Sequence, residues 1–161
     1  MLYVLSCGWL MLPVFVWNLA LTRHLPRAFQ PDVFWRDIPP VLGGAENTLR
    51  LAVSILPFLM PLPSGRLPIL SVGLYGVGLA VYGASWLALI WWPNSAWSQG
   101  VLGFTAPAYT AIFWLLGIAF FGRQLYVNIP YRWWVYVILS TLFTGVHVAH
   151  AVLVFNRMAP Q

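Results

Sequence analysis

Long apolar runs, separated by short polar segments, limit most strongly how this chain can fold. They cover residues 2–21, 41–62, 68–92, 104–121 and 133–155. A helix needs about 20 apolar residues to cross the hydrocarbon core of a bilayer. Only 7% of the residues are charged, against about 25% in a soluble domain, so most of the surface must face something apolar. The sequence therefore predicts an all-α integral membrane protein, a single domain built as a bundle of about five transmembrane helices.

Two of the predicted spans have special features. The first has no basic residues before it and no small-residue cleavage pattern, so we expect a retained helix and not a signal peptide. The second is the least regular. Glu46, Asn47 and Arg50 fall in its first turns, and Pro57 and Pro61 are expected to kink or end it.

The only long connection, residues 22–40, joins the first two spans. It is rich in proline and charge and contains Phe29, Phe34 and Trp35. This mixture is typical of a segment that lies in the membrane interface. We expect it to cover one end of the bundle.

Eight arginines and no lysine account for the basic side chains, and the formal net charge is +5. They lie in short segments beside apolar runs, which favours contact with anionic lipid head groups and not with nucleic acid. With five spans, one side would hold Arg23, Arg27, Arg36, Arg50 and Arg157, and the other Arg66, Arg123 and Arg132. The excess predicts a cytoplasmic C-terminus and an N-terminus outside, and we expect a bacterial inner membrane.

The third span contains small residues at every fourth position. Gly76, Ala80, Ala84 and Ala88 share one face of a helix, and such a face lets another helix pack closely. We therefore expect this face to be buried. The hydroxyl groups of Ser71, Tyr75, Tyr82 and Ser85 are expected to point into the bundle and find partners there.

Polar side chains converge at one depth of the predicted bundle. Glu46 lies near the start of the second span, and His147 and His150 lie near the end of the fifth. Odd-numbered spans end on the side where even-numbered spans begin, so these groups share one half of the membrane. The same parity adds Asn18, Ser85, Thr105, Tyr109 and Thr110. An ionisable residue at membrane depth is a functional candidate by default.

These residues supply the candidate site. The catalytic candidates are Glu46, His147 and His150, and the ligand-binding candidates are Arg36, Asp37, Asn47, Arg50 and Tyr109. A structural alternative remains for each group. Glu46 and Arg50 are spaced i, i+4 and could simply pair, and the histidines could only hydrogen-bond between helices.

Three kinds of chemistry fit this set. Zinc or iron could bind His147, His150 and Glu46, with His24 or Asp37 from the long connection. Haem could bind one of the two histidines with a distant partner. The third kind is acid–base chemistry on a lipid head group. Burial disfavours the charged forms of the glutamate and of the histidines, and this brings the proton affinities of the two residue types closer together. We find no nucleophile elbow, phosphate-binding loop or paired-aspartate motif.

Two function classes follow from the sequence. The first is a protein that binds a lipophilic ligand or a lipid head group in a polar cavity of the cytoplasmic leaflet, with lipid modification as an extension. The second is a non-catalytic structural or accessory subunit of a membrane complex, or a homo-oligomer, in which the polar groups lock helices together. A transporter fits less well, because one chain has too few helices for paired repeats.

Overall fold

The protein is all-helical over the residues that the computed structural model describes, 5–63 and 67–158. Five longer helices correspond to the five apolar runs, and two single-turn helices lie between them. In chain order they are α1 (Leu12–Leu21), α2 (Pro31–Phe34), α3 (Pro40–Ile55), α4 (Ile69–Trp91), α5 (Val101–Phe104), α6 (Ala106–Phe121) and α7 (Trp133–Met158). Short 3₁₀ helices precede α1 at Cys7–Met11 and continue α3 at Leu56–Leu59.

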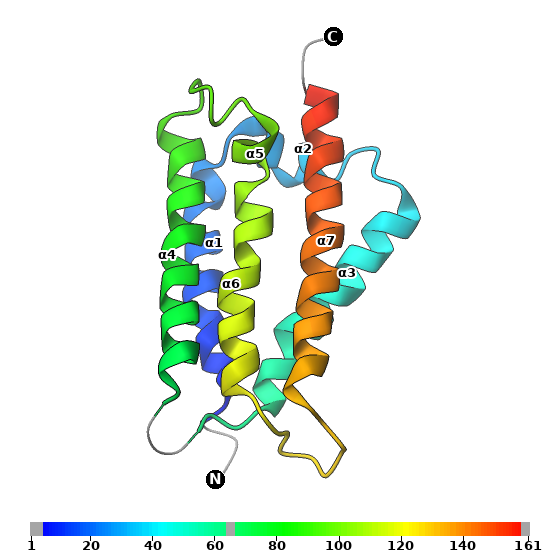
Figure 1. Cartoon of the computed structure of the whole chain (residues 1–161). Helices are drawn as coiled ribbons and strands as arrows, with labels where there is room; N and C mark the ends of the chain where they lie inside the picture. The colour runs from blue at the N-terminus through cyan, green and yellow to red at the C-terminus, as the bar shows by residue number, and fades with distance from the viewer. Residues whose placement is uncertain (1–4, 64–66, 159–161) are drawn as a thin grey trace.

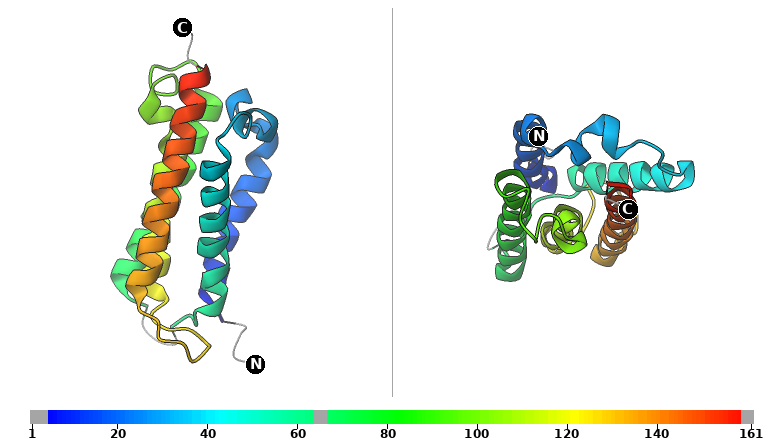
Figure 2. Two further views of the ribbon diagram at one scale, coloured as in Figure 1. Left: turned by 90° about the vertical axis from the view of Figure 1, so that its right-hand side faces the viewer. Right: turned by 90° about the horizontal axis from the view of Figure 1, so that it is seen from above.

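The five longer helices run alternately up and down (Figure 1). Seen from above, α4, α6 and α7 form one row, and α1 and α3 lie on the same side of it (Figure 2). Residues 22–39, which we call the strap, cross the end of the bundle at which α7 also ends. The first and last described segments, the start of the Cys7–Met11 helix and the end of α7, lie at opposite ends of the molecule.

The second apolar run changes its helical form at a proline, as the sequence predicts. Pro57 has no N–H to donate to the carbonyl of Val53, four residues earlier. The hydroxyl of Tyr136 on α7 donates to this carbonyl instead, with the two oxygens 2.8 Å apart. Tyr136 is fully buried. The break in α3 is therefore satisfied by a neighbouring helix, and the same contact fixes α3 against α7.

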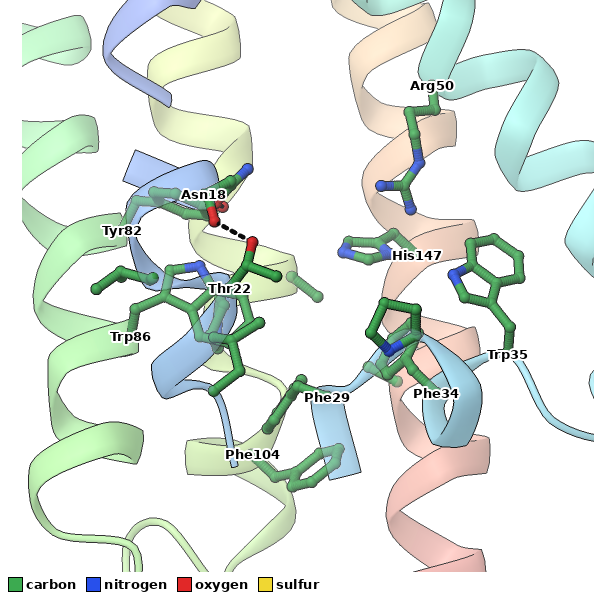
Figure 3. A pocket seen from close by; sticks show the side chains of 16 residues that line it. Asn18, Thr22, Phe29, Phe34, Trp35, Arg50, Tyr82, Trp86, Phe104 and His147 are labelled. Carbon is green, nitrogen blue, oxygen red and sulfur yellow. Dashed lines mark hydrogen bonds between the residues drawn. The ribbon is translucent and has the colours of Figure 1, made fainter. Parts of the chain in front are cut away.

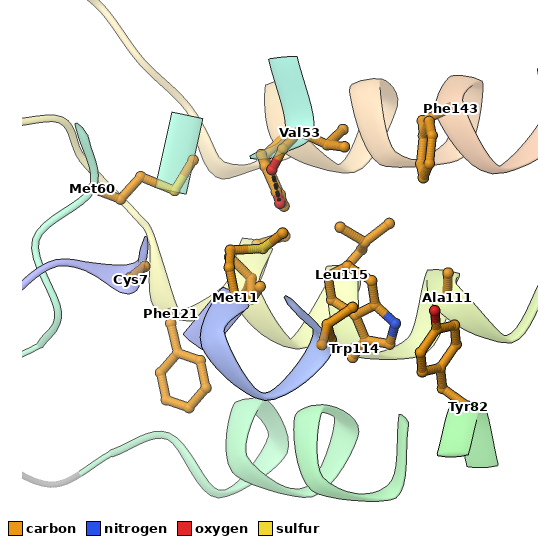
Figure 4. Close-up of a cluster of buried hydrophobic side chains, with 14 residues drawn as sticks. Cys7, Met11, Val53, Met60, Tyr82, Ala111, Trp114, Leu115, Phe121 and Phe143 are labelled. Atoms are coloured by element: carbon orange, nitrogen blue, oxygen red, sulfur yellow. Dashed lines mark hydrogen bonds between the residues drawn. The ribbon is translucent and has the colours of Figure 1, made fainter. Parts of the chain in front are cut away.

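An apolar core fills the half of the bundle away from the strap (Figure 4). Its buried side chains come from the 3₁₀ helices and from α1, α3, α4, α6 and α7. They include Met11, Val53, Met60, Leu115, Ile118 and Phe143. The backbone closes this end, because the amide of Cys7 donates to the carbonyl of Met60 over 2.8 Å.

Helix α4 packs on α6 through a different face from the one predicted. Gly76, Ala80 and Ala84 are exposed and Ala88 is only half-buried, so the prediction of a buried small-residue face was wrong. The close contact occurs at Gly78 instead. A Cβ atom there would lie 2.4 Å from the backbone nitrogen of Trp114 on α6. The α4 backbone therefore lies directly against the α6 backbone.

Three of the four hydroxyl groups on α4 that were predicted to find hydrogen-bond partners inside the bundle do so. Tyr75 donates to the carbonyl of Leu10 over 2.6 Å, and Ser85 donates to the carbonyl of Tyr82. The third, Tyr82, bonds to Asn18 and is described with the site. Ser71 is fully buried and has no hydrogen-bond partner within the described part of the chain.

Two helices, α4 and α7, are long and apolar enough to cross a membrane by length and composition, and α6 is a shorter apolar helix. Large apolar side chains are exposed on several helices. Ile69 is 90% exposed, Val41 85% and Leu19 79%. The first predicted span begins in residues outside the described ranges, and its helical part starts at Cys7.

Candidate functional site

A single carboxylate, that of Glu46, joins α3 to α7. Glu46 is fully buried. Its Oε1 atom accepts from Arg50 and lies 2.9 Å from Nδ1 of His147, and its Oε2 atom contacts Nδ1 of His150. We call these four residues the Glu46 cluster. The predicted convergence of Glu46 with both histidines is present in the structure.

Both ring nitrogens of His150 face acceptor atoms. Nδ1 contacts the Glu46 carboxylate, and Nε2 lies 2.9 Å from the backbone carbonyl oxygen of Phe34 in the strap. The side chain is fully buried. His150 therefore has no free lone pair with which to bind a metal in this arrangement. Within the described residues, no group of three or more His, Cys, Asp or Glu side chains is placed to hold a metal ion.

His147 is oriented differently, although it lies on the same face of α7. Its Nδ1 atom faces Glu46, and no hydrogen bond to its Nε2 atom is present among the described residues. Its side chain is 21% exposed. Phe143 stacks on the imidazole, with ring centroids 5.5 Å apart and planes 9° apart. His147 thus keeps one polar atom available to a ligand.

Arg50 places its guanidinium between two aromatic rings. The central carbon lies 5.8 Å from the ring centroid of Trp35 and 5.8 Å from that of Phe143, within the range of cation–π contacts. The Nε atom of Arg50 is buried and has no hydrogen-bond partner in the described chain. The side chain as a whole is 43% exposed.

A cavity of about 240 Å³ lies beside the cluster. Arg50 and His147 face it from one side, and Asn18, Tyr82 and Trp86 face it from the other (Figure 3). All five longer helices and the strap contribute to its lining. The lining residues are Asn18, Leu21, Thr22, Leu25, Phe29, Pro31, Phe34, Trp35, Arg50, Tyr82, Trp86, Phe104, Pro107, Ala108, His147 and Ala151.

The wall opposite the cluster is held by a bond between α1 and α4. The Tyr82 hydroxyl donates to Oδ1 of Asn18 over 2.7 Å. Asn18 therefore has its side-chain oxygen engaged. This pair supplies a second polar group at the same end of the cavity as His147 (Figure 3).

The strap closes the end of the cavity with aromatic rings. Phe29 stacks on Phe104 with centroids 4.5 Å apart, and it meets Trp86 edge-on with centroids 5.1 Å apart. Near the end of α7, Arg157 donates to the carbonyls of Val33 and Arg36. Together with the His150–Phe34 contact, these bonds fasten the strap to α7.

Other predicted site residues lie elsewhere. Arg36, Asp37, Asn47 and His24 are exposed, Tyr109 is half-buried on α6, and none of them lines the cavity. Thr105 and Thr110 donate to carbonyls of their own helical turn, those of Val101 and Ala106. Threonine often satisfies its hydroxyl in this way. Thr105 and Thr110 therefore have partners outside the Glu46 cluster, and neither lines the cavity.

Sequence reasoning missed the aromatic half of the site. Trp86 and Phe104 gave no signal, because aromatic side chains are frequent throughout this chain, with 17% of all residues. The acceptor at Phe34 is a backbone oxygen and has no sequence signature. Comparison with known proteins found no matching family model, curated protein or solved structure.

Proposed function

We propose that this chain is an integral membrane protein that binds an amphiphile in the cavity beside the Glu46 cluster. The observation that carries the proposal is the division of the cavity lining. Polar groups (Asn18, Arg50, Tyr82 and His147) lie towards one end, the rings of Phe29 and Phe104 lie at the other, and Trp86 lines the wall between Tyr82 and Phe29. A ligand with a polar head and an apolar body matches both parts.

Five membrane crossings belong to this proposal. Helices α4 and α7 are long enough by themselves. Helix α3 and its 3₁₀ extension form one helical stretch over residues 40–59, and α5 and α6 together cover residues 101–121. The 3₁₀ helices on both sides of α1, Cys7–Met11 and Thr22–His24, extend it over residues 7–24. These lengths approach the roughly 20 residues that a bilayer core requires. The exposed apolar side chains on the outer faces fit contact with lipid tails.

The proposed orientation places the strap and the C-terminus in the cytoplasm of a bacterium, with the protein in the inner membrane. Arg23, Arg27, Arg36 and Arg157 are exposed at this end. An excess of arginine in short cytoplasmic segments favours this arrangement. The cavity would then lie in the cytoplasmic half of the membrane.

The size of the cavity supports binding of a head group in preference to a whole lipid. Its volume of about 240 Å³ is below the range of roughly 300–1,000 Å³ that is usual for small-molecule pockets.

Acid–base chemistry on such a ligand would depend on His147. Glu46 is fully buried behind the cavity wall and already contacts three side chains. The Nε2 atom of His147 is the part of the cluster that could exchange a proton with a bound molecule, with Glu46 orienting the ring.

A structural role is the second candidate, and the cluster itself favours it. Glu46 ties α3 to α7, and His150 ties both to the strap. An accessory subunit that only needs a rigid fold could use the same contacts. In that case the cavity would hold lipid without preference.

The test is retention of lipid by variants of the aromatic wall. The protein is purified in a mild detergent, and co-purified lipids are identified by mass spectrometry. We expect Trp86→Ala to lose lipid that the wild-type protein retains, because the ring forms the wall against which Phe29 packs. Trp91→Ala is the matched control, because Trp91 is on the same helix and is 63% exposed. Equal retention by both variants and the wild-type protein would favour the structural role.

A further inference from the structure

The Glu46 cluster contains one more positive charge than negative charge. From this excess we infer that the cavity takes a singly charged oxyanion head group, a carboxylate or a phosphate ester, beside Arg50 and His147. The inference deepens the proposed function and rests on it, because it names the chemical class of the amphiphile.

The first step concerns the proton between Glu46 and His150. The carbonyl oxygen of Phe34 can only accept, so Nε2 of His150 must carry a hydrogen. The other nitrogen, Nδ1, contacts a carboxylate oxygen, and this contact needs one proton between the two atoms. The proton can reside on either side. In both cases Glu46 and His150 together have no net charge.

The second step concerns Arg50, which is always protonated in proteins. Its contact with Glu46 suggests a neutral ion pair. However, the charge of Glu46 is already balanced by the proton that it shares with His150. One positive charge therefore remains on the cluster, and protonation of His147 would only add to it. None of the residues that line the cavity is acidic. The other two acidic residues of the chain, Asp32 and Asp37, lie in the strap and are exposed.

The third step concerns access. An uncompensated charge at membrane depth is expensive, so a counter-ion is favoured there. Arg50 lines the cavity, and its side chain is 43% exposed. Nε2 of His147 is also available. Guanidinium groups bind carboxylate and phosphate oxygens strongly, because the hydrogen bonds are charge-assisted.

The experiment compares probes that differ only in the head group. Wild-type protein in an uncharged detergent is titrated with palmitate, the phosphate diester methyl hexadecyl phosphate, and hexadecanol, with tryptophan emission as the signal. We expect at least one anion to bind about tenfold more tightly than the alcohol, or more. The stronger anion identifies the head group as carboxylate or phosphate. Equal binding of all three would overturn the inference and leave the proposed function standing. No binding of any probe would contradict the proposed function itself.

Variants of Arg50 test whether the preference for the anionic probe depends on the positive charge of this residue. Arg50→Gln should lose the preference for the anion and still bind hexadecanol, whereas Arg50→Lys should keep it. Arg123→Gln, an exposed arginine at the other end of the molecule, is the matched control. An undiminished preference in a folded Arg50→Gln protein would overturn the inference. If Arg50→Gln does not fold, the wild-type comparison and Arg50→Lys still decide.

Glu46→Gln separates the inference from a neutral Arg50–Glu46 pair. Without the carboxylate, His150 no longer needs the shared proton, and the charge of the cluster stays at one. The variant should still prefer the anion, because Arg50 keeps its charge and the glutamine oxygen can still accept from Arg50 and His147. If the preference were absent in the wild-type protein and appeared only in Glu46→Gln, Glu46 would be neutralising Arg50 and the inference would be wrong.

Discussion

The two histidines of α7 lie one helical turn apart but have different surroundings, so their replacement should have different effects. His150 is fully buried between Glu46 and the strap, whereas His147 makes one hydrogen bond, to Glu46, and has a free edge on the cavity. Glutamine cannot reach both partners of His150, so His150→Gln should lower the free energy of unfolding by about 1–3 kcal/mol. His147→Gln should cost less, about 0.6 kcal/mol. Thermal unfolding in detergent measures both changes.

Ligand retention should show the opposite order. His147→Gln should lose the co-purified ligand while it remains folded, because the amide replaces the one cluster group with a free edge on the cavity. Ser71→Ala is the control for both measurements. Its hydroxyl is buried near the start of α4, away from Tyr82 and Trp86, and makes no hydrogen bond in the described chain. Equal loss of stability and equal ligand retention in the two histidine variants would contradict this assignment.

One part of the site, the Glu46 cluster, could be predicted from the positions of its residues in the sequence. The parity of the spans placed Glu46, His147, His150 and Arg50 at one depth, and the structure brings them together. Depth alone cannot say which way a side chain points around a helix. For that reason Tyr109 shares the depth but does not line the cavity. The aromatic wall and the Phe34 carbonyl depend on how the strap folds back, which no local pattern records.

At the scale of helices, the contact between α4 and α6 depends on Gly78. Gly78→Ala would place a methyl group against the α6 backbone, which cannot move as a flexible side chain can. We expect a loss of about 1–3 kcal/mol in the free energy of unfolding. Gly76→Ala is the matched control, because no atom lies within 4 Å of its Cβ position. It should be neutral or stabilising by up to about 1 kcal/mol, through helix propensity. Similar losses from both changes would refute this packing.

The approximate ranges of α4, α6 and α7 match the apolar runs, whereas α1 and α3 are shorter than the runs that predicted them. The orientation of α4 could not be predicted. Apolar runs and prolines indicate where helices begin and end. Gly76, Ala80 and Ala84 form as smooth a face as the one that packs, and an outer face in contact with lipid is also apolar. The sequence pattern therefore does not distinguish the inner face from the outer one. The decisive residue, Gly78, is recognised by its distance from Trp114.

The attachment of the strap to α7 can be tested through Arg157. Its guanidinium donates to two strap carbonyls, those of Val33 and Arg36. Arg157→Gln should increase amide hydrogen exchange in residues 31–36, because local opening becomes easier when these bonds are lost. Exchange in α6 should not change. Unaltered exchange in residues 31–36 would mean that His150 and the aromatic contacts hold the strap without Arg157.

At the scale of the whole molecule, the proposed topology makes a direct prediction. Five crossings place the two ends of the chain on opposite sides of the membrane. A reporter that is active only in the cytoplasm should be active when it is fused after Gln161, and a periplasmic reporter at the same position should be silent. The reversed pattern would contradict the orientation. The cavity would then lie in the outer leaflet, and its geometry would be unchanged.

The most direct test of the central claim is an experimental structure of the protein extracted with its native lipids. We predict elongated non-protein density in the cavity, with one end in contact with Arg50 and His147 and the other among Phe29, Trp86 and Phe104. A cavity that contains only water, or that is closed by side chains after extraction with native lipids, would contradict the claim that this protein binds an amphiphile there.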